Sequence, residues 1–321
     1  MNVRSATAQD ATGIVALHRS ANPFGEWFRD PFQKLGRVPY EYLTPLERYL
    51  HGGFWMDLSL FRRHLHEYQT RGFPVIVAED GGRIVGECEV WLDEEPAPFG
   101  RYAEVEMLET GSPPRPDVER ALVSRAAERV GKLGFPAIDM SPQHGGSEGV
   151  VNLGFEPLWD TREFQGETKG VPKPEVEFDA KFLAGGYERI GPLLALNHRE
   201  PARWRYETIT ALWPAGLAAG LQDATKAVAM AVETEAQRFA VVAARRAWLE
   251  PPVAEVDVWM EPENVEDGTR IREAFQISVE IARRLGTKTV KTYAPPRSAE
   301  DLHDLGLAGG ETPDRWLRWS F

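Results

Sequence analysis

The sequence lacks several features that would assign it to a specialised class of protein. Its 321 residues include one cysteine, Cys88, so an internal disulfide framework is excluded. No apolar run approaches the roughly 20 residues of a membrane-spanning helix. Residues 1–10 are polar and charged, unlike a signal peptide. We therefore expect a cytoplasmic protein with no membrane partner.

Basic residues are outnumbered by acidic ones. The 37 Lys and Arg residues stand against 49 Asp and Glu residues, which gives a net charge of −12. Non-specific binding of nucleic acid requires basic groups that displace counterions from phosphates. We therefore expect no nucleic-acid partner. The charge would suit a cationic small substrate, although acidic surfaces also serve solubility.

The dipeptide Leu-Gly recurs with a regular displacement. Leu133-Gly134 is followed 20 residues later by Leu153-Gly154. Leu285-Gly286 and Leu305-Gly306 repeat this pair at a displacement of 152 residues (285 − 133). A period this long indicates a duplicated domain rather than a solenoid.

A second match supports the duplication. Ala-Glu-Val-Glu at 103–106 corresponds to Ala-Glu-Val-Asp at 254–257, displaced by 151 residues (254 − 103). Residues 166–175 form a polar linker with two prolines. We place one domain at residues 1–168 and the other at residues 169–321.

Both halves predict the same order of elements: a strand, helices, three successive strands, a long helix, a strand, a short helix and a last strand. In the first half, the long helix carries its apolar face at spacings of three or four residues and ends at Gly134. Helices interspersed among strands, with a βαβ crossover late in each half, indicate an α/β or α+β fold. We predict the α+β class with a mixed sheet. In the second half, we expect helices at 186–197 and 207–221, and a strand at 253–260.

This order resembles the GNAT superfamily of N-acetyltransferases. In the first half, the resemblance is carried by VRSATAQDA at 3–11 and by NLGFEP at 152–157. It spans nearly the whole chain as a tandem pair. It implies two GNAT-like acyl-CoA N-acyltransferase domains and transfer of an acetyl group from acetyl-CoA to a primary amine.

The resemblance also implies how acetyl-CoA would bind. In this family, pantetheine pairs with the edge of the fourth strand where it splays from the fifth, and the pyrophosphate contacts the N-terminus of the long helix. The family's loop has Gln or Arg, two residues, Gly, one residue, and Gly or Ala. In the second half, Gly268 matches the first glycine and Pro262 an accompanying proline. The match assigns the following residues to the cofactor: Met260, Glu261, Gly268, Thr269 and Arg270.

The first half matches that loop less well. Asp117 and Glu119 stand where glycines belong, beside Pro114 and Pro116, which have no N–H to donate. We therefore favour the second half as the acyl-CoA site.

The resemblance implies a base on the fourth strand and a tyrosine acid on the short helix. Glu255 and Asp257 share one face of the fourth strand, because side chains alternate along a strand. They would serve as the base, or they would form a solvated polar face. The expected tyrosine position holds Val150 and Leu302 in the two halves. Tyr293 and His303 are the substitutes in that neighbourhood, and we select Tyr293.

Residues 22–72 are rich in aromatic side chains and contain three histidines. In the resembling family this region borders the acceptor pocket, where aromatic rings would hold an amine by cation–π contacts. Packing between the halves or at a dimer interface is the alternative. His64 and His66 would point to different faces of a helix, and we expect no metal.

We therefore predict an N-acetyltransferase that acetylates a small-molecule or peptide amine, as a monomer or homodimer. The alternative is a catalytically inactive GNAT-like binding or scaffold protein. The two differ in whether residues 260–270 border an open cleft with free strand-edge N–H groups, or are plugged by Trp259 or Phe275.

Overall fold

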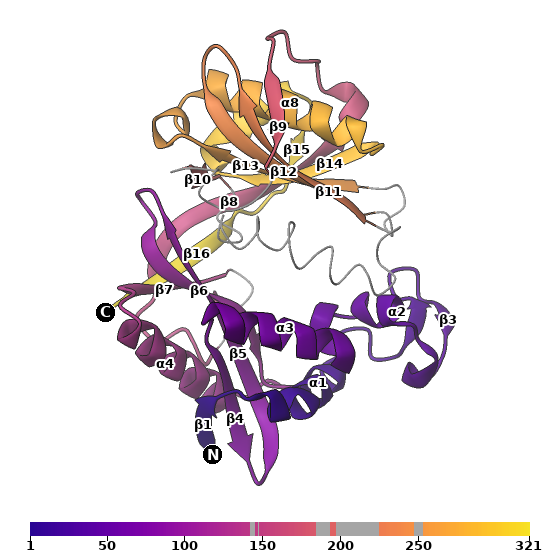
Figure 1. The fold of residues 1–321 in the computed structure, drawn as a ribbon, viewed down its shortest axis with the longest axis vertical. Coiled ribbons are helices and arrows are strands. Elements are labelled where there is room, and N and C mark those ends of the chain that lie inside the picture. Colours follow the sequence, from indigo (N-terminus) through magenta and orange to yellow (C-terminus); the bar gives the residue numbers. More distant parts are fainter. Residues whose placement is uncertain (142–144, 147, 184–192, 197–224, 247–252) are drawn as a thin grey trace. The chain divides into compact units, whose positions relative to one another are not determined.

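The computed structural model describes residues 1–141, 145–146, 148–183, 193–196, 225–246 and 253–321 (Figure 1). The chain forms two compact units. Unit 1 comprises residues 1–92, 102–156 and 317–321, and unit 2 comprises residues 93–101 and 157–316. No helix in the described ranges is long and apolar enough to cross a membrane.

Unit 1 is built on a mixed sheet with the strand order β1-β4-β5-β6-β7-β16. β1 pairs antiparallel with β4, β4 antiparallel with β5, β6 parallel with β7, and β7 antiparallel with β16. The bounds are β1 Asn2–Ser5, β4 Val75–Asp80, β5 Arg83–Glu95, β6 Gly100–Glu109, β7 Ala137–Met140 and β16 Asp314–Ser320.

Helices pack on both faces of this sheet. α4 carries Val118, Leu122 and Ala126 on one face, and these residues join a core with Cys88 and Val90 of β5. α1 and α3 contact the opposite face, because their histidines bond the intervening glutamates of β5. The helices are α1 Ala11–Ser20, α2 Pro45–Tyr49, α3 Leu58–Arg71 and α4 Pro116–Lys132, with short 3-10 turns η1 Ala8–Asp10, η2 Tyr40–Tyr42 and η3 Gly53–Met56. A small hairpin, β2 Phe28–Asp30 and β3 Leu35–Arg37, accompanies them.

Unit 2 repeats the plan with the strand order β8-β14-β13-β12-β11-β9. β13 and β14 are parallel, and the other pairs along this order are antiparallel. The bounds are β8 Glu156–Glu167, β9 Asp179–Phe182, β11 Thr225–Glu233, β12 Arg238–Arg246, β13 Val253–Met260 and β14 Thr289–Ala294. Two further strands of two residues each are β10 Leu194–Ala195, which pairs with β13, and β15 Ala308–Gly309, which pairs with β8.

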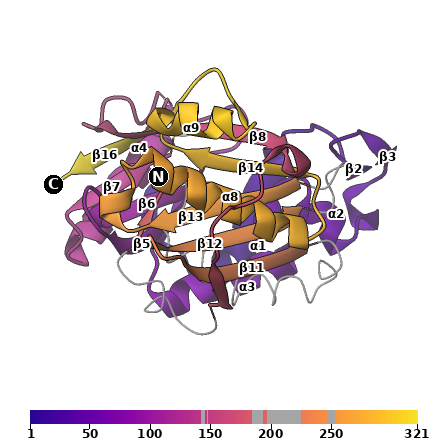
Figure 2. The same ribbon diagram turned by 90° about the horizontal axis from the view of Figure 1, so that it is seen from above.

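The long helix of unit 2 is α8, Gly268–Arg284, which lies across the sheet strands in the view of Figure 2. It buries Ile271, Phe275 and Val279, as its apolar spacing predicts. The remaining helical elements are η4 Thr168–Gly170, η7 Pro262–Asn264, η8 Pro296–Ser298 and α9 Ala299–Asp304. On the sheet's other face, Trp259 packs in an apolar cluster with Leu183, Leu193 and Val242.

Each unit receives its closing strand from a distant part of the sequence. β8 directly follows the first NLGF motif, but it pairs with β14 in unit 2, from Glu167↔Thr289 to Arg162↔Ala294. The C-terminal strand β16 pairs with β7 of unit 1, from Leu317↔Met140 to Ser320↔Ala137. The compact units therefore differ from the predicted ranges 1–168 and 169–321. Whether those ranges fold as independent domains stays a prediction.

One predicted element is wrong within the described residues. The helix expected at 186–197 is interrupted, because residues 194–195 form β10. Residues 193 and 196 are not helical either. Residues 186–192 and 197 of that predicted helix, and the helix expected at 207–221, lie outside the described residues. The strand predicted at 253–260 is confirmed as β13.

Candidate functional site

The strands β13 and β14 separate in unit 2 at the place where the sequence analysis puts pantetheine. Their parallel pairing runs from Val253↔Thr289 to Val256↔Thr292 and stops there. β13 continues for four more residues to Met260. The splayed pair that the fold requires for acyl-CoA is therefore present in outline.

The chain itself occupies the open edge of β13. β10 pairs antiparallel with this edge, with Leu194 opposite Met260 and Ala195 opposite Trp259. The backbone N–H of Leu196 donates to the Val258 carbonyl oxygen at 3.0 Å. Trp259 and Phe275 are both buried. Pantetheine binding along Met260 and Glu261 stays a prediction, and it requires that β10 leave this edge.

The N-terminus of α8 already holds a carboxylate. Asp267 accepts hydrogen bonds from the backbone N–H groups of Thr269 at 2.9 Å and Arg270 at 3.2 Å. A helix N-terminus attracts an anion, and Asp267 meets that preference. A Cβ built on Gly268 would lie 2.5 Å from Asp301 Oδ2, so a second carboxylate borders this turn. Phosphate binding by Gly268, Thr269 and Arg270 stays a prediction that would require displacing Asp267.

The three predicted catalytic residues lie on adjacent strands of unit 2. Glu255 and Asp257 are buried on β13, and Glu255 is in register with Lys291 of β14. The Tyr293 hydroxyl donates to Glu163 Oε2 at 2.8 Å, and Lys291 Nζ lies 2.6 Å from the same oxygen. Burial alone would lower the pKa of Lys291, but Glu163 raises it above its usual value. Tyr293 therefore already uses its proton in a hydrogen bond, and its role as an acid stays a prediction.

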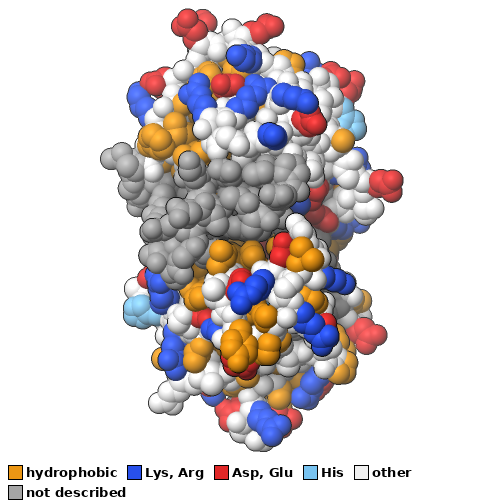
Figure 3. Space-filling model, turned by 90° about the vertical axis from the view of Figure 1, so that its right-hand side faces the viewer, with side chains coloured by type: hydrophobic (Ala, Val, Ile, Leu, Met, Phe, Trp, Pro, Cys, Tyr) orange, Lys and Arg blue, Asp and Glu red, His pale blue; other side chains and the backbone are white. Residues whose placement is uncertain are grey.

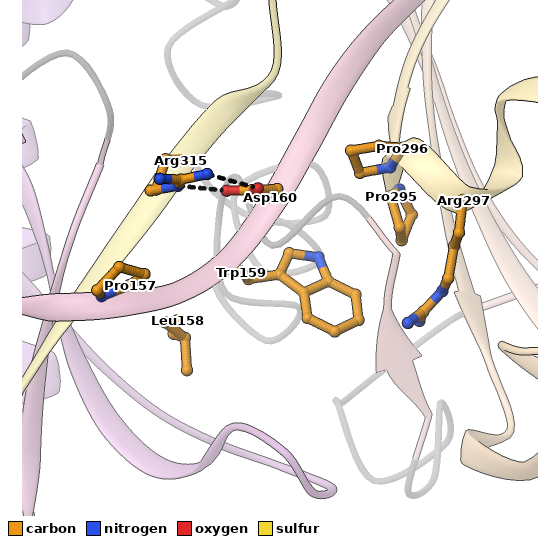
Figure 4. Close-up of a pocket in the computed structure, with 8 residues that line it drawn as sticks. All are labelled: Pro157, Leu158, Trp159, Asp160, Pro295, Pro296, Arg297 and Arg315. Atoms are coloured by element: carbon orange, nitrogen blue, oxygen red, sulfur yellow. Dashed lines mark hydrogen bonds and ion pairs between the residues drawn. The ribbon is translucent and has the colours of Figure 1, made fainter.

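A groove in unit 2 lies beyond the end of β14. It encloses about 450 Å³ and is lined by prolines, two arginines, Leu158, Trp159 and Asp160 (Figure 4). Arg315 pairs with Asp160 at 2.9 Å, and Arg297 pairs with Glu266 at 2.8 Å while lying over the Trp159 ring at 4.8 Å. Both guanidinium groups are thus neutralised by carboxylates, and the groove carries no net attraction for an anion.

In unit 1, the sheet face that corresponds to the one with Glu255 and Asp257 in unit 2 carries a different set of side chains. Glu104 and Glu106 of β6 are the counterparts of Glu255 and Asp257 at the displacement of 151 residues. On the neighbouring strand, Glu87 and Glu89 alternate with the core residues and face away from α4. Both are 0% exposed. Burying an ionised group costs free energy unless it is paired. The cost of burying Glu87 and Glu89 therefore depends on their partners.

Each of these two buried glutamates contacts a histidine. His18 Nε2 of α1 lies 2.5 Å from Glu87 Oε2, and His64 Nε2 of α3 lies 2.7 Å from Glu89 Oε2. The indole N–H of Trp55 donates to the other oxygen of Glu89 at 3.0 Å. The two histidines, two glutamates and the tryptophan form one network, which we call the His–Glu cluster.

Burial shifts the pKa values of the groups in the cluster. Burial lowers the pKa of His18 to about 4, so the ring is neutral at pH 7. Burial and the neighbouring Glu89 carboxylate raise the pKa of Glu87 well above its usual value. Burial would also raise the pKa of Glu89, but His64 and the Trp55 N–H hold it below its usual value. The pKa values of the two carboxyl groups are therefore shifted in opposite directions.

The sequence alone predicts no role for Glu87 and Glu89, because charged residues at alternate positions of a strand normally indicate a solvated face. His64 belongs to the aromatic tract, where its ring lies 5.2 Å from Phe54 and 4.3 Å from Tyr68. The available signal was the presence of two histidines ahead of a strand in which two glutamates alternate with apolar residues.

Unit 1 also has splayed strands next to this face. β6 and β7 pair in parallel from Ala103↔Ile138 to Val105↔Met140, and β6 then continues to Glu109. In the described part of unit 1, no strand pairs with residues 107–109 on the β7 side, whereas β10 does so on β13. This edge of β6 therefore differs from the edge of β13, which β10 occupies.

The N-terminus of α4 also carries carboxylates. Arg115 is the N-cap residue and makes no side-chain capping bond, while Asp117 and Glu119 lie in the first turn and the Asp117 carboxylate bonds first-turn backbone N–H groups. Pro116 at the first helical position removes one N–H donor. Arg115 is paired with the exposed Asp117 at 3.2 Å. Arg115 also lies 3.9 Å from Asp80, so carboxylates offset its charge as they do for the arginines of the groove in unit 2.

Among the described residues, no group of three or more His, Cys, Asp or Glu side chains is arranged to hold a metal ion. The face drawn in Figure 3 shows Lys and Arg interspersed with Asp and Glu. No basic area therefore dominates that face.

Comparison with known proteins identifies the fold. No protein-family model and no curated protein sequence matches the chain. Two solved structures align over 99% of it: a GCN5-related N-acetyltransferase from Anabaena variabilis, at 10% identity and TM-score 0.57, and one from Kribbella flavida, at 14% identity and TM-score 0.55. The alignments cover 72% and 71% of those chains. The chain therefore has the α+β fold of the GCN5-related N-acetyltransferases, and its two units carry that fold in tandem.

Proposed function

We propose that the chain transfers an acetyl group from acetyl-CoA to a primary amine, and that unit 1 carries out the transfer. The fold supports the reaction class, and one observation supports the choice of unit. The edge of the splayed strand is filled by β10 in unit 2 and has no such strand in the described part of unit 1. This replaces our expectation that the second half is the better site.

The residues that would hold acetyl-CoA follow from the geometry of unit 1. The backbone of residues 107–109 would pair with the pantetheine amides, as strand edges pair with extended ligands. Arg115 at the start of α4 would contact the phosphates. Acetyl-CoA would supply the activated thioester. The protein would supply position, charge and a proton acceptor.

Glu106 is the base that this proposal requires. An amine must lose a proton before it attacks a thioester, and a carboxylate within reach accelerates that step. Glu106 is half-buried on β6, on the same face as the His–Glu cluster, and it continues β6 beyond its last pair with β7. The acidic face would also attract a cationic amine, whether a small molecule or a peptide.

Matched substitutions in the two units test the proposal. We would incubate acetyl-CoA with a panel of primary amines and measure release of free thiol. Glu106→Gln should lower kcat by about 10²–10³-fold, the usual contribution of general base catalysis. Asp257→Asn, the same change at the corresponding position of unit 2, should leave kcat unchanged.

The reverse result would move the active site to unit 2 and restore the roles predicted for Glu255, Asp257 and Tyr293. If no amine accelerates thiol release, and acetyl-CoA does not bind, the chain is the alternative, a catalytically inactive binding or scaffold protein. The filled edge and capped helix of unit 2 already favour that description for unit 2 alone.

A further inference from the structure

The last turn of α1 carries an arginine that has no carboxylate partner. Arg19 is partly exposed, and its guanidinium carbon lies 3.4 Å from the centroid of the Tyr40 ring. In the part of the chain that the structure describes, Arg19 makes no ion pair and no hydrogen bond. A guanidinium stacked on a ring keeps its N–H donors at its edge, where they match the oxygens of a carboxylate or phosphate. Arg19 is therefore oriented for an anion that the chain itself does not supply.

The ring beneath Arg19 is fixed by contacts of its own. The Tyr40 hydroxyl donates to the Met56 carbonyl oxygen at 2.8 Å, and the Trp27 ring meets the Tyr40 ring edge to face at 5.1 Å. A second guanidinium, that of Arg48, lies 4.4 Å from the same ring centroid. Because the ring is held, the guanidinium stacked on it has a defined direction.

The carboxylates nearest to this ring have other partners or make no ion pair with Arg19. The buried Asp57 pairs with Arg48 at 2.8 Å and accepts from the backbone N–H of Leu60 at the start of α3. The exposed Glu41 contacts Arg48 through its backbone oxygen at 3.5 Å, and its carboxylate makes no ion pair with Arg19. The positive charge of Arg19 is thus left without an ion-pair partner in the described chain.

The stacked arginines also change what the aromatic tract can bind at this point. The aromatic side chains of residues 22–72 predict cation–π contacts with an amine. Tyr40 already lies against two guanidinium groups of the chain, and these would repel a further cation. The part of the tract next to Arg19 therefore suits an anionic group better than an ammonium group.

The same turn of α1 lies beside the segment that follows β6. A Cβ built on Gly111 would lie 3.3 Å from Leu17 Cδ1 and 3.8 Å from Ser20 Oγ. His18, which precedes Arg19, contacts Glu87 on the acidic face of the sheet. Arg19 is therefore carried by the helix that borders both the acidic face and the end of the strand proposed to bind acetyl-CoA.

We propose that Arg19 binds an oxyanion of a substrate of unit 1, either the carboxylate of an amino-acid or peptide acceptor or a phosphate of acetyl-CoA. The inference rests on the proposed function of unit 1. An amino acid would place its ammonium group at the acidic face around Glu106 and its carboxylate at Arg19. No bond forms or breaks at Arg19, so its loss affects binding and leaves the chemical step unchanged.

Two arginine variants and two amines test the site in the acetyl-transfer assay. Arg19→Gln removes the guanidinium, and Arg29→Gln makes the matched change at an arginine that pairs with Glu47 at 3.1 Å. The amines are β-alanine and propylamine, which differ in having a carboxylate or a methyl group. Circular dichroism would show that both variants fold.

The two sources of the oxyanion give different results. If the acceptor supplies it, Arg19→Gln should raise KM for β-alanine at least about tenfold, with kcat and the KM for propylamine unchanged. If acetyl-CoA supplies it, Arg19→Gln should weaken acetyl-CoA binding at least about tenfold in isothermal titration, with either amine. Arg29→Gln should change none of these quantities. Unchanged KM for β-alanine together with unchanged acetyl-CoA affinity in Arg19→Gln would overturn the proposal.

A readout without acetyl transfer separates failure of this site from failure of the proposed function. In nuclear magnetic resonance spectra of protein with isotope-labelled arginine, the Arg19 side-chain signal is identified by its loss in Arg19→Gln. The signal should shift on addition of β-alanine but not propylamine, or on addition of acetyl-CoA. A signal that moves with neither would overturn the site even in an active enzyme. A shift in a protein that acetylates no amine would refute the proposed function only.

Discussion

The strands β6 and β13 hold the same place in their respective sheets, but the space beside them is used differently. In unit 2, β10 hydrogen-bonds the free edge of β13, and the face of the sheet is filled by Trp259 and aliphatic residues. In unit 1, the corresponding face carries buried glutamates with histidine partners. The comparison shows that two copies of one fold can fill the same space with different kinds of side chain.

The two sheet faces also differ in how much they contribute to the free energy of unfolding. Apolar filling stabilises unit 2 through removal of apolar surface from water. The ionisable groups of unit 1 contribute less, because desolvation offsets much of their mutual attraction. Unit 2 also buries Glu255 and Asp257, so buried carboxyl groups alone do not distinguish the units. The proposal for unit 1 rests on the edge of β6 at residues 107–109, which no described strand of unit 1 occupies on the β7 side.

The largest effect should come from cutting the chain at the predicted boundary. A chain of residues 1–168 lacks β16, so β7 loses its antiparallel partner and β8 has no β14 to pair with. We expect loss of cooperative unfolding, measured by circular dichroism in urea. A chain of residues 1–156 joined through a flexible linker to residues 314–321 should fold. Cooperative folding of residues 1–168 alone would show that the exchanged strands are not required.

Removing Trp259 should reduce stability without reducing activity. Trp259→Ala leaves a cavity in the apolar cluster of unit 2 and should cost about 3–5 kcal/mol of the free energy of unfolding. Acetyl transfer below the unfolding temperature should not change. In unit 1, Trp55→Phe removes the N–H that donates to Glu89 and should cost about 1–3 kcal/mol of the free energy of unfolding. Loss of acetyl transfer in Trp259→Ala below its unfolding temperature would contradict the comparison.

The free energy of unfolding should decrease as the pH is lowered, because His18 is buried in its neutral form. Its pKa is about 4 in the folded chain against 6.5 ordinarily, since burial disfavours the charged ring. Between these values the unfolded chain binds a proton that the folded chain does not. The free energy of unfolding should therefore decrease as the pH falls from 6.5 to 4, by up to about 3 kcal/mol.

Urea unfolding at a series of pH values would measure this dependence. Glu89 has a lowered pKa and acts in the same direction, whereas Glu87 has a raised pKa and loses its contribution as the pH rises. The difference between wild type and His18→Gln isolates the histidine. A steeper slope in the variant would mean that His18 is charged in the folded chain.

The smallest effect should come from the groove of unit 2. Arg297→Ala removes a cation over the Trp159 ring and an ion pair with the exposed Glu266. Partly exposed contacts of this kind contribute about 0–1 kcal/mol each. We expect a small loss of stability and a change in tryptophan fluorescence, with no effect on acetyl transfer. A loss of activity would give this groove a part in the reaction.

Much of the fold was predictable from the sequence, because the spacing of apolar residues along a segment indicates whether it forms a helix or a strand. The repeated Leu-Gly pairs located the two copies, and the apolar spacing of 268–285 predicted α8. The strand exchange was not predictable. A strand that follows the NLGF motif has the same pattern whichever sheet it joins, and β8 joins the sheet of unit 2.

The candidate site was predictable only in part. Glu255 and Tyr293 do lie on adjacent strands, as their positions suggested. The residues 194–195 show no alternation of apolar and polar side chains, so nothing local distinguishes β10 from a helix. The partners of the His–Glu cluster are 69 and 25 residues apart in sequence, and such pairings are a property of the tertiary structure.

The most direct test of the assignment to unit 1 is isothermal titration of acetyl-CoA into the full chain and two charge-reversal variants. Arg115→Glu and Arg270→Glu change partly exposed arginines at the N-termini of α4 and α8, so both variants should fold. We predict one binding site per chain, weakened at least about tenfold by Arg115→Glu, or about 1.4 kcal/mol, and unaffected by Arg270→Glu. Weakening by Arg270→Glu alone would place the cofactor in unit 2 and contradict this account.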